Sequence, residues 1–172
     1  MPKPTQAPIS SKPRAGWLTP EQQRVWRAYI TGSQVLLDRL DRELRESHQL
    51  SLPEYEILVR LSESPQRSRR MAELATSLSH SRSRVTHTIS RMERDGLVTR
   101  TACPTDGRGV VAVLTDKGEQ QLVDAAPGHV DAVQAHFVGR ADPADFVAMG
   151  RVFSAVLERL GSQLDKELVE HG

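Results

Sequence analysis

Hydrophobic residues recur every three or four positions along most of the chain, which is the spacing of helices with one buried face. The first such stretch opens at Thr19, which together with Gln22 has the pattern of a capping box. Its apolar positions run from Trp26 to Leu44. The pattern predicts a long first helix that ends near Ser47.

Three shorter helical stretches follow. Ser51 begins a second capping-box pattern, and we expect the helix after it to end before Pro65. Apolar residues over Met71–Leu78 predict a short helix, and after a serine-rich break we expect another over Arg82–Asp95. Gly96 is a natural stop for that helix, because glycine readily adopts the left-handed conformation in which many helices end.

Beyond Gly96 the pattern changes from helical spacing to β-branched character. The segments Val98–Cys103 and Val110–Leu114 are rich in valine and threonine, which favours two strands. Residues 104–109 between them include a proline, an aspartate and two glycines. Since these are turn-forming residues, we expect a hairpin with a flexible tip.

The C-terminal part returns to helical spacing. Thr115 has the position of a helix cap, and we expect a kink at Pro127, where one backbone hydrogen bond is lost, before the helix resumes through Phe137. A last helix is predicted to open at Pro143 and to run to Leu168, with apolar residues three and four apart. The predicted fold is mainly α, with a small β-hairpin wing.

Length and composition restrict the class of protein. A chain of 172 residues fits one domain with helical extensions, and residues 1–17, with four prolines and few apolar residues, predict a disordered tail. Without an apolar run of membrane length or a signal-peptide core, we expect a soluble, cytoplasmic protein with no membrane association. The single cysteine excludes an intramolecular disulfide, and the six histidines lack metal-site spacing. No catalytic motif is present, so we expect no enzyme, no metal and no cofactor.

Charge is distributed unevenly, although the formal net charge is only +1. Residues 66–108 contain nine arginines, no lysine and four acids, a net charge of +5, whereas the remaining residues carry 14 basic and 18 acidic side chains, a net charge of −4. The planar guanidinium suits phosphate and guanine edges. A near-neutral total therefore does not exclude a nucleic-acid partner.

Two short helices, the serine-rich turn between them and the hairpin are the parts of a winged helix-turn-helix. In the second helix, Val85, Ile89 and Met92 share one side. The opposite side has no large apolar residue and no acid, and it offers hydroxyls, an imidazole and guanidiniums that can donate to DNA. The candidate DNA-binding residues of this helix are Ser81, Arg82, Ser83, Arg84, Thr86, His87, Ser90, Arg91 and Arg94.

The predicted hairpin tip carries a further candidate, Arg108, between two glycines. A single wing arginine can enter an adjacent minor groove, where narrow A·T-rich sequence concentrates negative potential. Asp106, two residues away, is placed to pair with it. The alternative is an ordinary surface turn with an ion pair of little energetic value.

At these residues the sequence resembles the MarR family of transcriptional regulators, over roughly Leu18 to Leu168. The helix-turn-helix part is shared by many winged-helix families, whereas the Asp-x-Arg wing followed by Leu-Thr-x-x-Gly is more specific. Ala72 departs from the family pattern, in which a capping Ser or Thr is common at that position. The segments that carry the resemblance are Met71–Ala75, Ser81–Thr86, Glu93–Val98, Asp106–Arg108 and Leu114–Gly118.

The resemblance implies a homodimer in which the terminal helical regions, residues 18–50 and 116–170, interlock around the DNA-binding region 51–115. It also implies double-stranded DNA with a pseudo-palindromic operator as the partner, repression of transcription, and release by a small-molecule effector. By position, Arg108 matches the wing arginine of the family and Asp106 its partner.

An effector pocket, by the same resemblance, would lie between the first, second and fifth helices and the DNA-binding lobe. Trp26, Tyr29, His48 and Tyr55 are the candidate ligand-binding residues, although packing between protomers or lobes also explains each. Two other functions stay open: a winged-helix module for protein contacts, and a thiol-based redox sensor acting through Cys103.

Overall fold

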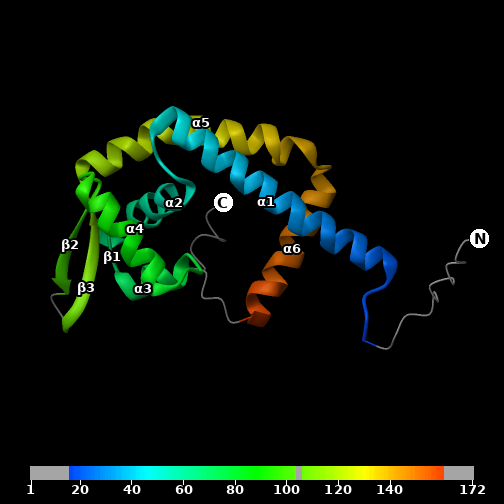
Figure 1. Ribbon diagram of the computed structural model, residues 1–172, viewed down its shortest axis with the longest axis horizontal. Helices are drawn as coiled ribbons and strands as arrows, with labels where there is room; N and C mark the ends of the chain where they lie inside the picture. Colours follow the sequence, from blue (N-terminus) through cyan, green and yellow to red (C-terminus); the bar gives the residue numbers. More distant parts are fainter. Residues whose placement is uncertain (1–15, 104–105, 161–172) are drawn as a thin grey trace, which may run out of the picture. The chain divides into compact units, whose positions relative to one another are not determined.

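The computed structural model describes residues 16–103 and 106–160 (Figure 1). Two compact units make up the chain, and they meet within the first helix, between Leu36 and Leu37. The main elements are α1 (Pro20–His48), α2 (Leu52–Ser62), β1 (Ser68–Arg70), α3 (Met71–Ser77), α4 (Arg82–Arg94), β2 (Val98–Cys103), β3 (Asp106–Leu114), α5 (Asp116–His136) and α6 (Pro143–Leu160). The predicted class, mainly α with a small β wing, is confirmed.

Local capping signals explain where the first helices begin. The side chain of Gln22 accepts a hydrogen bond from the backbone N–H of Thr19, and the Thr19 hydroxyl accepts one from the backbone N–H of Gln22, so the predicted capping box is formed. A second capping box joins Ser51 and Glu54 at the start of α2. Both helices therefore start where the sequence predicts, and α1 ends one residue beyond the predicted Ser47.

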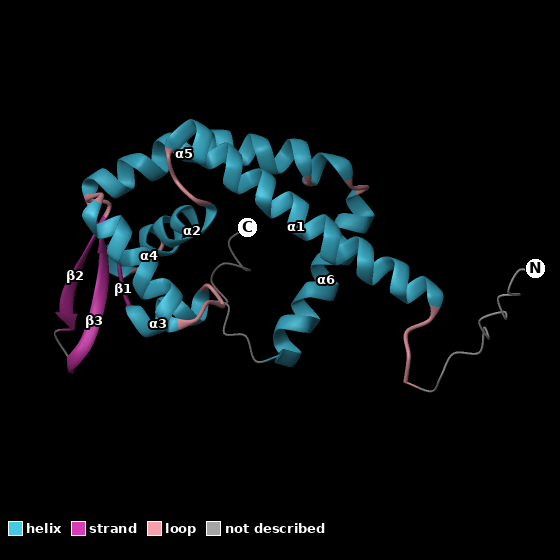
Figure 2. Ribbon diagram, viewed as in Figure 1, coloured by secondary structure: helices cyan, strands magenta, loops and turns pink. Residues whose placement is uncertain are grey.

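The sheet has three antiparallel strands in the order β1-β3-β2, one more than the predicted hairpin (Figure 2). The additional strand β1 pairs Ser68–Arg70 with residues 111–113 of β3. It escaped prediction because three polar residues show no periodicity. Strand β3 is also longer than predicted, beginning at Asp106 rather than Val110, and a register shift lies between Ala102 and Cys103.

The hydrophobic core of the second unit lies where α2, α3, α4 and the sheet meet. Val85, Ile89 and Met92, the predicted inner side of α4, are fully buried there. Their partners include Leu58 of α2 and Leu74 of α3, which are also fully buried. Burial of this one face fixes which side of α4 stays at the surface.

The C-terminal helices follow the prediction with one correction. Helix α5 continues through Pro127 to His136, so the proline does not interrupt it, and Thr115 caps its first turn as predicted. A short 3₁₀ turn, Val138–Arg140, then leads to α6. The predicted extension to Leu168 and most of the predicted tail 1–17 lie outside the described residues. In the part of the chain that the structure describes, no helix combines the length and the apolar character that crossing a membrane requires.

Candidate nucleic-acid interface

Helix α4 is held at its N-terminus by Ser81. The Ser81 hydroxyl accepts a hydrogen bond from the backbone N–H of Arg84 at 3.3 Å, and its oxygen lies 3.2 Å from the hydroxyl oxygen of Ser83. This cap satisfies one of the free amides of the first turn. The first turn contains no acid, and Arg82 and Arg84 are exposed in it. The N-terminal end of α4 is therefore open to an anionic partner.

The outer side of α4 has the composition that the periodicity predicted. Ser83, Thr86, His87 and Arg94 are exposed, and Ser90 is half-buried. Thr88, on the inner side, turns its hydroxyl to the backbone carbonyl of Arg84. The exposed side therefore offers donors for phosphates and base edges, without a large apolar residue.

Several central arginines form ion pairs with carboxylates, but three of the four arginines of α4 do not. Arg67 pairs with Glu119 at 2.6 Å, and Arg100 pairs with Glu93 at 2.6 Å. Among the described arginines of the central segment, residues 66–108, three that belong to α4 form no salt bridge to a carboxylate. They are Arg82, Arg84 and Arg94. Within the central segment, α4 therefore carries three arginines whose charge no carboxylate neutralises.

Arg91 differs from the other arginines of α4. Its Nε donates to Oε1 of Glu54 on α2 at 2.6 Å, and its side chain is 40% exposed. Arg91 is one of the predicted DNA contacts, and in the structure it also has an intramolecular partner that lies 37 residues away along the chain. Glu54 was recognised from the sequence only as a capping residue, because a distant ion pair leaves no periodic signal.

The C-terminal end of α4 is fastened to the start of α5. Gly96 adopts a positive φ of 75°, which ends the helix as predicted. The ammonium of Lys117 donates to the backbone carbonyl of Asp95 at 2.6 Å, and the hydroxyl of Thr115 lies 2.8 Å from the carbonyl oxygen of Gly96. Gly118 packs against Leu97 so closely that a Cβ atom would lie 2.1 Å from its carbonyl oxygen. Any movement of α5 at this end must therefore involve α4.

The wing is the hairpin of β2 and β3, and the side chains at its tip are outside the described part of the chain. Strand β3 begins at Asp106, but the side chains of Asp106 and Arg108 are outside the described part, so the predicted pair between them stays a prediction. Cys103, at the end of β2, is only 6% exposed. Burial limits access of an oxidant to this thiol, which weighs against the redox-sensor alternative.

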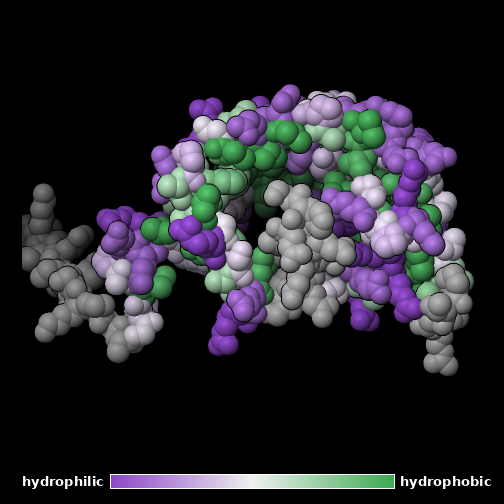
Figure 3. Space-filling view, turned by 180° about the vertical axis from the view of Figure 1, so that it is seen from behind, coloured by the Kyte–Doolittle hydropathy of each residue, from purple (hydrophilic) through white to green (hydrophobic). Residues whose placement is uncertain are grey.

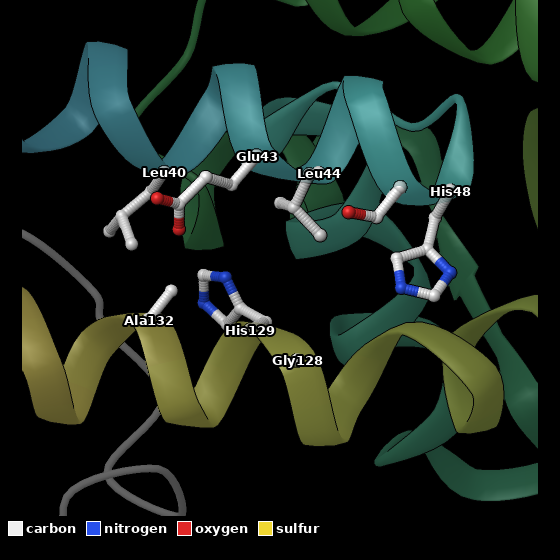
Figure 4. Close-up of a pocket in the computed structure, with 8 residues that line it drawn as sticks. Leu40, Glu43, Leu44, His48, Gly128, His129 and Ala132 are labelled. Atoms are coloured by element: carbon white, nitrogen blue, oxygen red, sulfur yellow. The ribbon is translucent and has the colours of Figure 1, made fainter.

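A small pocket lies between the second half of α1 and α5 (Figure 4). Its volume is about 140 Å³. Glu43 turns its carboxylate toward α5, where His136 Nε2 lies 3.0 Å from Oε1, and the hydrogen bonds from His136 and Arg39 lower the pKa of Glu43 below its usual value. The lining residues are Leu40, Glu43, Leu44, Ser47, His48, Gly128, His129 and Ala132.

His129 is the most unusual group of this pocket. Its ring faces α1 in Figure 4 and lies 4.4 Å, centroid to centroid, from the ring of Tyr55 on α2. Its Nδ1 atom is buried and has no hydrogen-bond partner in the described structure. Burial lowers the pKa of His129, which favours a neutral imidazole near pH 7. Neither the spacing nor the neighbours of His129 in the chain predict that this imidazole lines a pocket.

The four predicted ligand-binding residues have different environments. His48 lines the pocket, whereas Tyr55 is buried behind His129 and is not among the lining residues. Trp26 and Tyr29 belong to the N-terminal unit, where their exposed rings lie 5.8 Å apart. No group of three or more His, Cys, Asp or Glu side chains that could hold a metal ion occurs within residues 16–103 and 106–160.

Comparison with known proteins identifies the family to which this arrangement belongs. The family model of the MarR family matches residues 50–110. The curated transcriptional repressor Rv2887 of Mycobacterium tuberculosis is 34% identical over 113 residues, which are 66% of this chain and 76% of the relative.

Two solved structures from Streptomyces coelicolor are also similar. Sco3205, a MarR family transcriptional regulator crystallised in complex with DNA, is 43% identical with a TM-score of 0.82, covering 87% of this chain and 97% of that one. AbsC, another member of the family, is 38% identical with a TM-score of 0.80, covering 86% of this chain and 99% of that one. The chain described here is therefore a member of the MarR family of transcriptional regulators, and not an enzyme.

Proposed function

We propose that the chain is a homodimeric repressor whose two α4 helices bind the half-sites of a pseudo-palindromic operator. The observation that carries this proposal is the concentration of Arg82, Arg84 and Arg94, without carboxylate partners, on the exposed side of α4. Two relatives support it: Sco3205 was crystallised in complex with DNA, and the Mycobacterium tuberculosis relative is named a transcriptional repressor. In this proposal Ser83, Thr86 and His87 discriminate between bases, and the arginines contact phosphates or base edges.

Exposed apolar residues of the terminal helices support the homodimer. Figure 3 shows hydrophobic residues, in green, at the surface of one face of the chain. No residue of α6 is buried within the described chain, although this helix has an apolar stripe. Two-fold pairing of such stripes would remove them from water and set two recognition helices about one DNA turn, ~34 Å, apart. The exposed large residues concerned are Trp17, Val25, Trp26, Val35 and Leu37 toward the N-terminus and Val147, Val152, Val156 and Leu160 of α6.

Release by a small molecule is the part of the proposal that rests on the pocket between α1 and α5. A volume of about 140 Å³ suits a molecule the size of a single aromatic ring. His48, His129 and Glu43 supply polar contacts on apolar walls. Because α5 is fastened to the end of α4 by Lys117 and Gly118, a ligand that prefers a different position of α5 would change the presentation of α4.

Operator binding tests the proposal directly. Fragments selected from genomic DNA are titrated with the full chain by fluorescence anisotropy at several salt concentrations. We expect affinity to fall steeply with salt, and Arg84→Ala to lower the slope by about one unit, because each neutralised phosphate contributes roughly 0.9. Arg151→Ala, an exposed arginine of α6, is the matched control and should leave binding unchanged. Binding without salt dependence or sequence preference would favour the protein-contact module instead.

The wing has its own test. Arg108→Ala should lower operator affinity without changing the dimer, because a wing arginine in the minor groove contacts DNA and not the partner protomer. A gel-shift titration with unchanged affinity would remove the wing from the interface. It would leave the role of α4 standing.

A further inference from the structure

A buried carboxylate lies directly beneath the recognition helix. Glu54, in the first turn of α2, is only 5% exposed. Its Oε2 accepts hydrogen bonds from the backbone N–H of Ser51 at 2.8 Å and from the Ser51 hydroxyl at 2.6 Å. Its Oε1 accepts from Nε of Arg91 at 2.6 Å. Both oxygens of Glu54 are therefore engaged, and one of them holds a side chain of α4.

Glu54 is ionised in this setting. Burial alone would raise the pKa of its carboxyl, but the hydrogen bonds from Ser51 and Arg91 outweigh burial, so the pKa lies below its usual value. A charged carboxylate with fixed oxygens is a rigid acceptor, and hydrogen bonds to it are stronger than those between neutral groups. The position of the Arg91 guanidinium is thus set by α2 as well as by its own helix.

The contact with Glu54 leaves most donors of Arg91 available. A guanidinium has five N–H donors, and the ion pair uses the one at Nε. The Nη atoms have no hydrogen-bond partner among the described residues, and 40% of the side chain is exposed. Arg91 follows Arg84 by seven residues and precedes Arg94 by three, so helical spacing places it beside two arginines that have no carboxylate partner.

We propose that Glu54 is a positioning residue for DNA binding, which holds the guanidinium of Arg91 so that its Nη atoms donate to a backbone phosphate. This inference rests on the proposed operator binding by α4. The advantage is entropic: the free protein has already given up the rotamer freedom of Arg91, so DNA binding does not have to restrict it again. Within the interface, Arg91 then links a buried anion on α2 to a phosphate.

Removal of the Glu54 charge has opposite expected effects on operator affinity with and without the positioning role. A negative charge near DNA repels phosphate, so its removal should tighten binding if charge were all that mattered. Our proposal predicts the reverse for Glu54→Gln, a loss of about two- to tenfold in operator affinity, which is the cost of restricting one flexible side chain. Glu56→Gln removes a carboxylate of the same helix that attracts Arg84 of α4 through space but has no hydrogen bond to it among the described residues, so it tests the loss of a negative charge alone. This control variant should bind as tightly as wild type or more tightly.

A double-mutant cycle identifies the route of the effect. Operator affinity is measured by anisotropy for the wild-type chain, Glu54→Gln, Arg91→Ala and the double variant. We expect Arg91→Ala to lower the salt slope by about one and Glu54→Gln to cost nothing further in that background. Equal losses in both backgrounds would show that Glu54 acts through the fold and not through Arg91. Unchanged or tighter binding of Glu54→Gln would also overturn the proposal.

A second variant leaves the buried carboxylate of Glu54 in place. Arg91→Lys keeps the positive charge but lacks a fork that can hold a carboxylate and a phosphate at once, so it should lose affinity nearly as Arg91→Ala does. Full retention of affinity by Arg91→Lys would contradict the proposal. If the wild-type chain bound none of the selected fragments, the proposed operator binding would be wrong. If the chain bound DNA but the losses of Glu54→Gln and Arg91→Ala simply added in the double variant, only the positioning role of Glu54 would be wrong.

Discussion

At the scale of single residues, two glycines of α5 occupy opposite environments. A Cβ atom on Gly118 would lie 2.1 Å from the carbonyl oxygen of Leu97 and 2.8 Å from Cδ1 of Leu114. A Cβ atom on Gly128 would meet nothing closer than Nε2 of His48 at 3.8 Å, an ordinary contact. The same substitution by alanine is therefore expected to act with opposite sign at the two positions.

Gly118→Ala should lower the free energy of unfolding by about 1–3 kcal/mol, the usual cost of overpacking. The backbone of Leu97 cannot turn aside as a flexible side chain can, so α5 must move away from the end of α4. Gly128→Ala should instead raise the free energy of unfolding by about 0.5–1 kcal/mol, because glycine is a poor residue within a helix. Urea unfolding of both variants checks the pair, and equal effects would contradict the close contact at Gly118.

His129 predicts a pH dependence of stability. Burial lowers the pKa of its imidazole, while Tyr55 of α2 and Glu43 and His48 of α1 are the titratable groups near it. The unfolded chain then binds the proton more readily than the folded chain. The stabilisation is fully present above the usual histidine pKa of about 6.5 and is lost as the pH falls from there toward the lowered value.

Substitution removes this one contribution. His129→Phe keeps a ring beside Tyr55 and cannot titrate, so its stability should decline less than that of wild type between pH 7.5 and pH 5.5. Chemical unfolding across this range measures the difference. Parallel curves for wild type and His129→Phe would show that His129 titrates alike in both states.

At the scale of elements, the junction of α4 and α5 is maintained by side chains that cap a helix end. Lys117→Met removes the ammonium that donates to the carbonyl of Asp95. Because that contact is exposed, we expect a cost of only about 0.5–1 kcal/mol, together with faster amide hydrogen exchange in the last turn of α4. Exchange measured by mass spectrometry or NMR tests this. Protection unchanged at residues 91–95 would show that Gly96 alone ends the helix.

The helix boundaries that the sequence predicts correctly depend on residues that are close together in the chain. Ser51 with Glu54, and Thr115 before α5, are caps formed within four residues, and the buried side of α4 follows from periodicity alone. Strand β1 is different, because its only partner, β3, lies some forty residues later. Helix α5 is continuous through Pro127, because a proline removes only one backbone hydrogen bond, and the kink expected there stays a prediction.

The same distinction holds for the candidate site. The exposed side of α4 was predictable from local spacing, but the partner of Arg91 and the faces that form the pocket come from elements far apart in sequence. His129 carries no local signal, because its unsatisfied Nδ1 arises from packing against Tyr55. Contacts between residues of two different elements could therefore not be predicted from the sequence alone.

At the scale of the whole molecule, the ion pairs show which of the many basic side chains still carry a charge that DNA could attract. The central segment has a net charge of +5, yet Arg67, Arg91 and Arg100 each face a carboxylate. Among the described arginines of this segment, Arg82, Arg84 and Arg94 of α4 keep a charge that no carboxylate neutralises. These three arginines should therefore contribute to the salt dependence of DNA binding more than Arg67 and Arg100 do.

Several apolar side chains of α6 are exposed in the single chain, and the proposed homodimer would bury them. Val152 is 60% exposed and Val156 also lies at the surface, one turn further along the same side. If these residues meet their counterparts across a two-fold axis, each substitution acts twice in the dimer. Val152→Asp should therefore raise the dimer dissociation constant by about a hundredfold or more, because losing ~1.5 kcal/mol of burial in each protomer adds up to ~3 kcal/mol.

Sedimentation equilibrium measures this constant, and the DNA titration shows its consequence. A monomer engages only one half-site, so the effective concentration that joins the second half-site disappears, and operator affinity should fall at protein concentrations below the dimer dissociation constant. Ser154→Asp places the same charge on another side of α6, about 200° around the helix from Val152, and should leave both measurements unchanged. A Val152→Asp variant that remains dimeric and binds the operator normally would exclude this stripe from the interface, and a wild-type chain that is monomeric at micromolar concentration would exclude the homodimer.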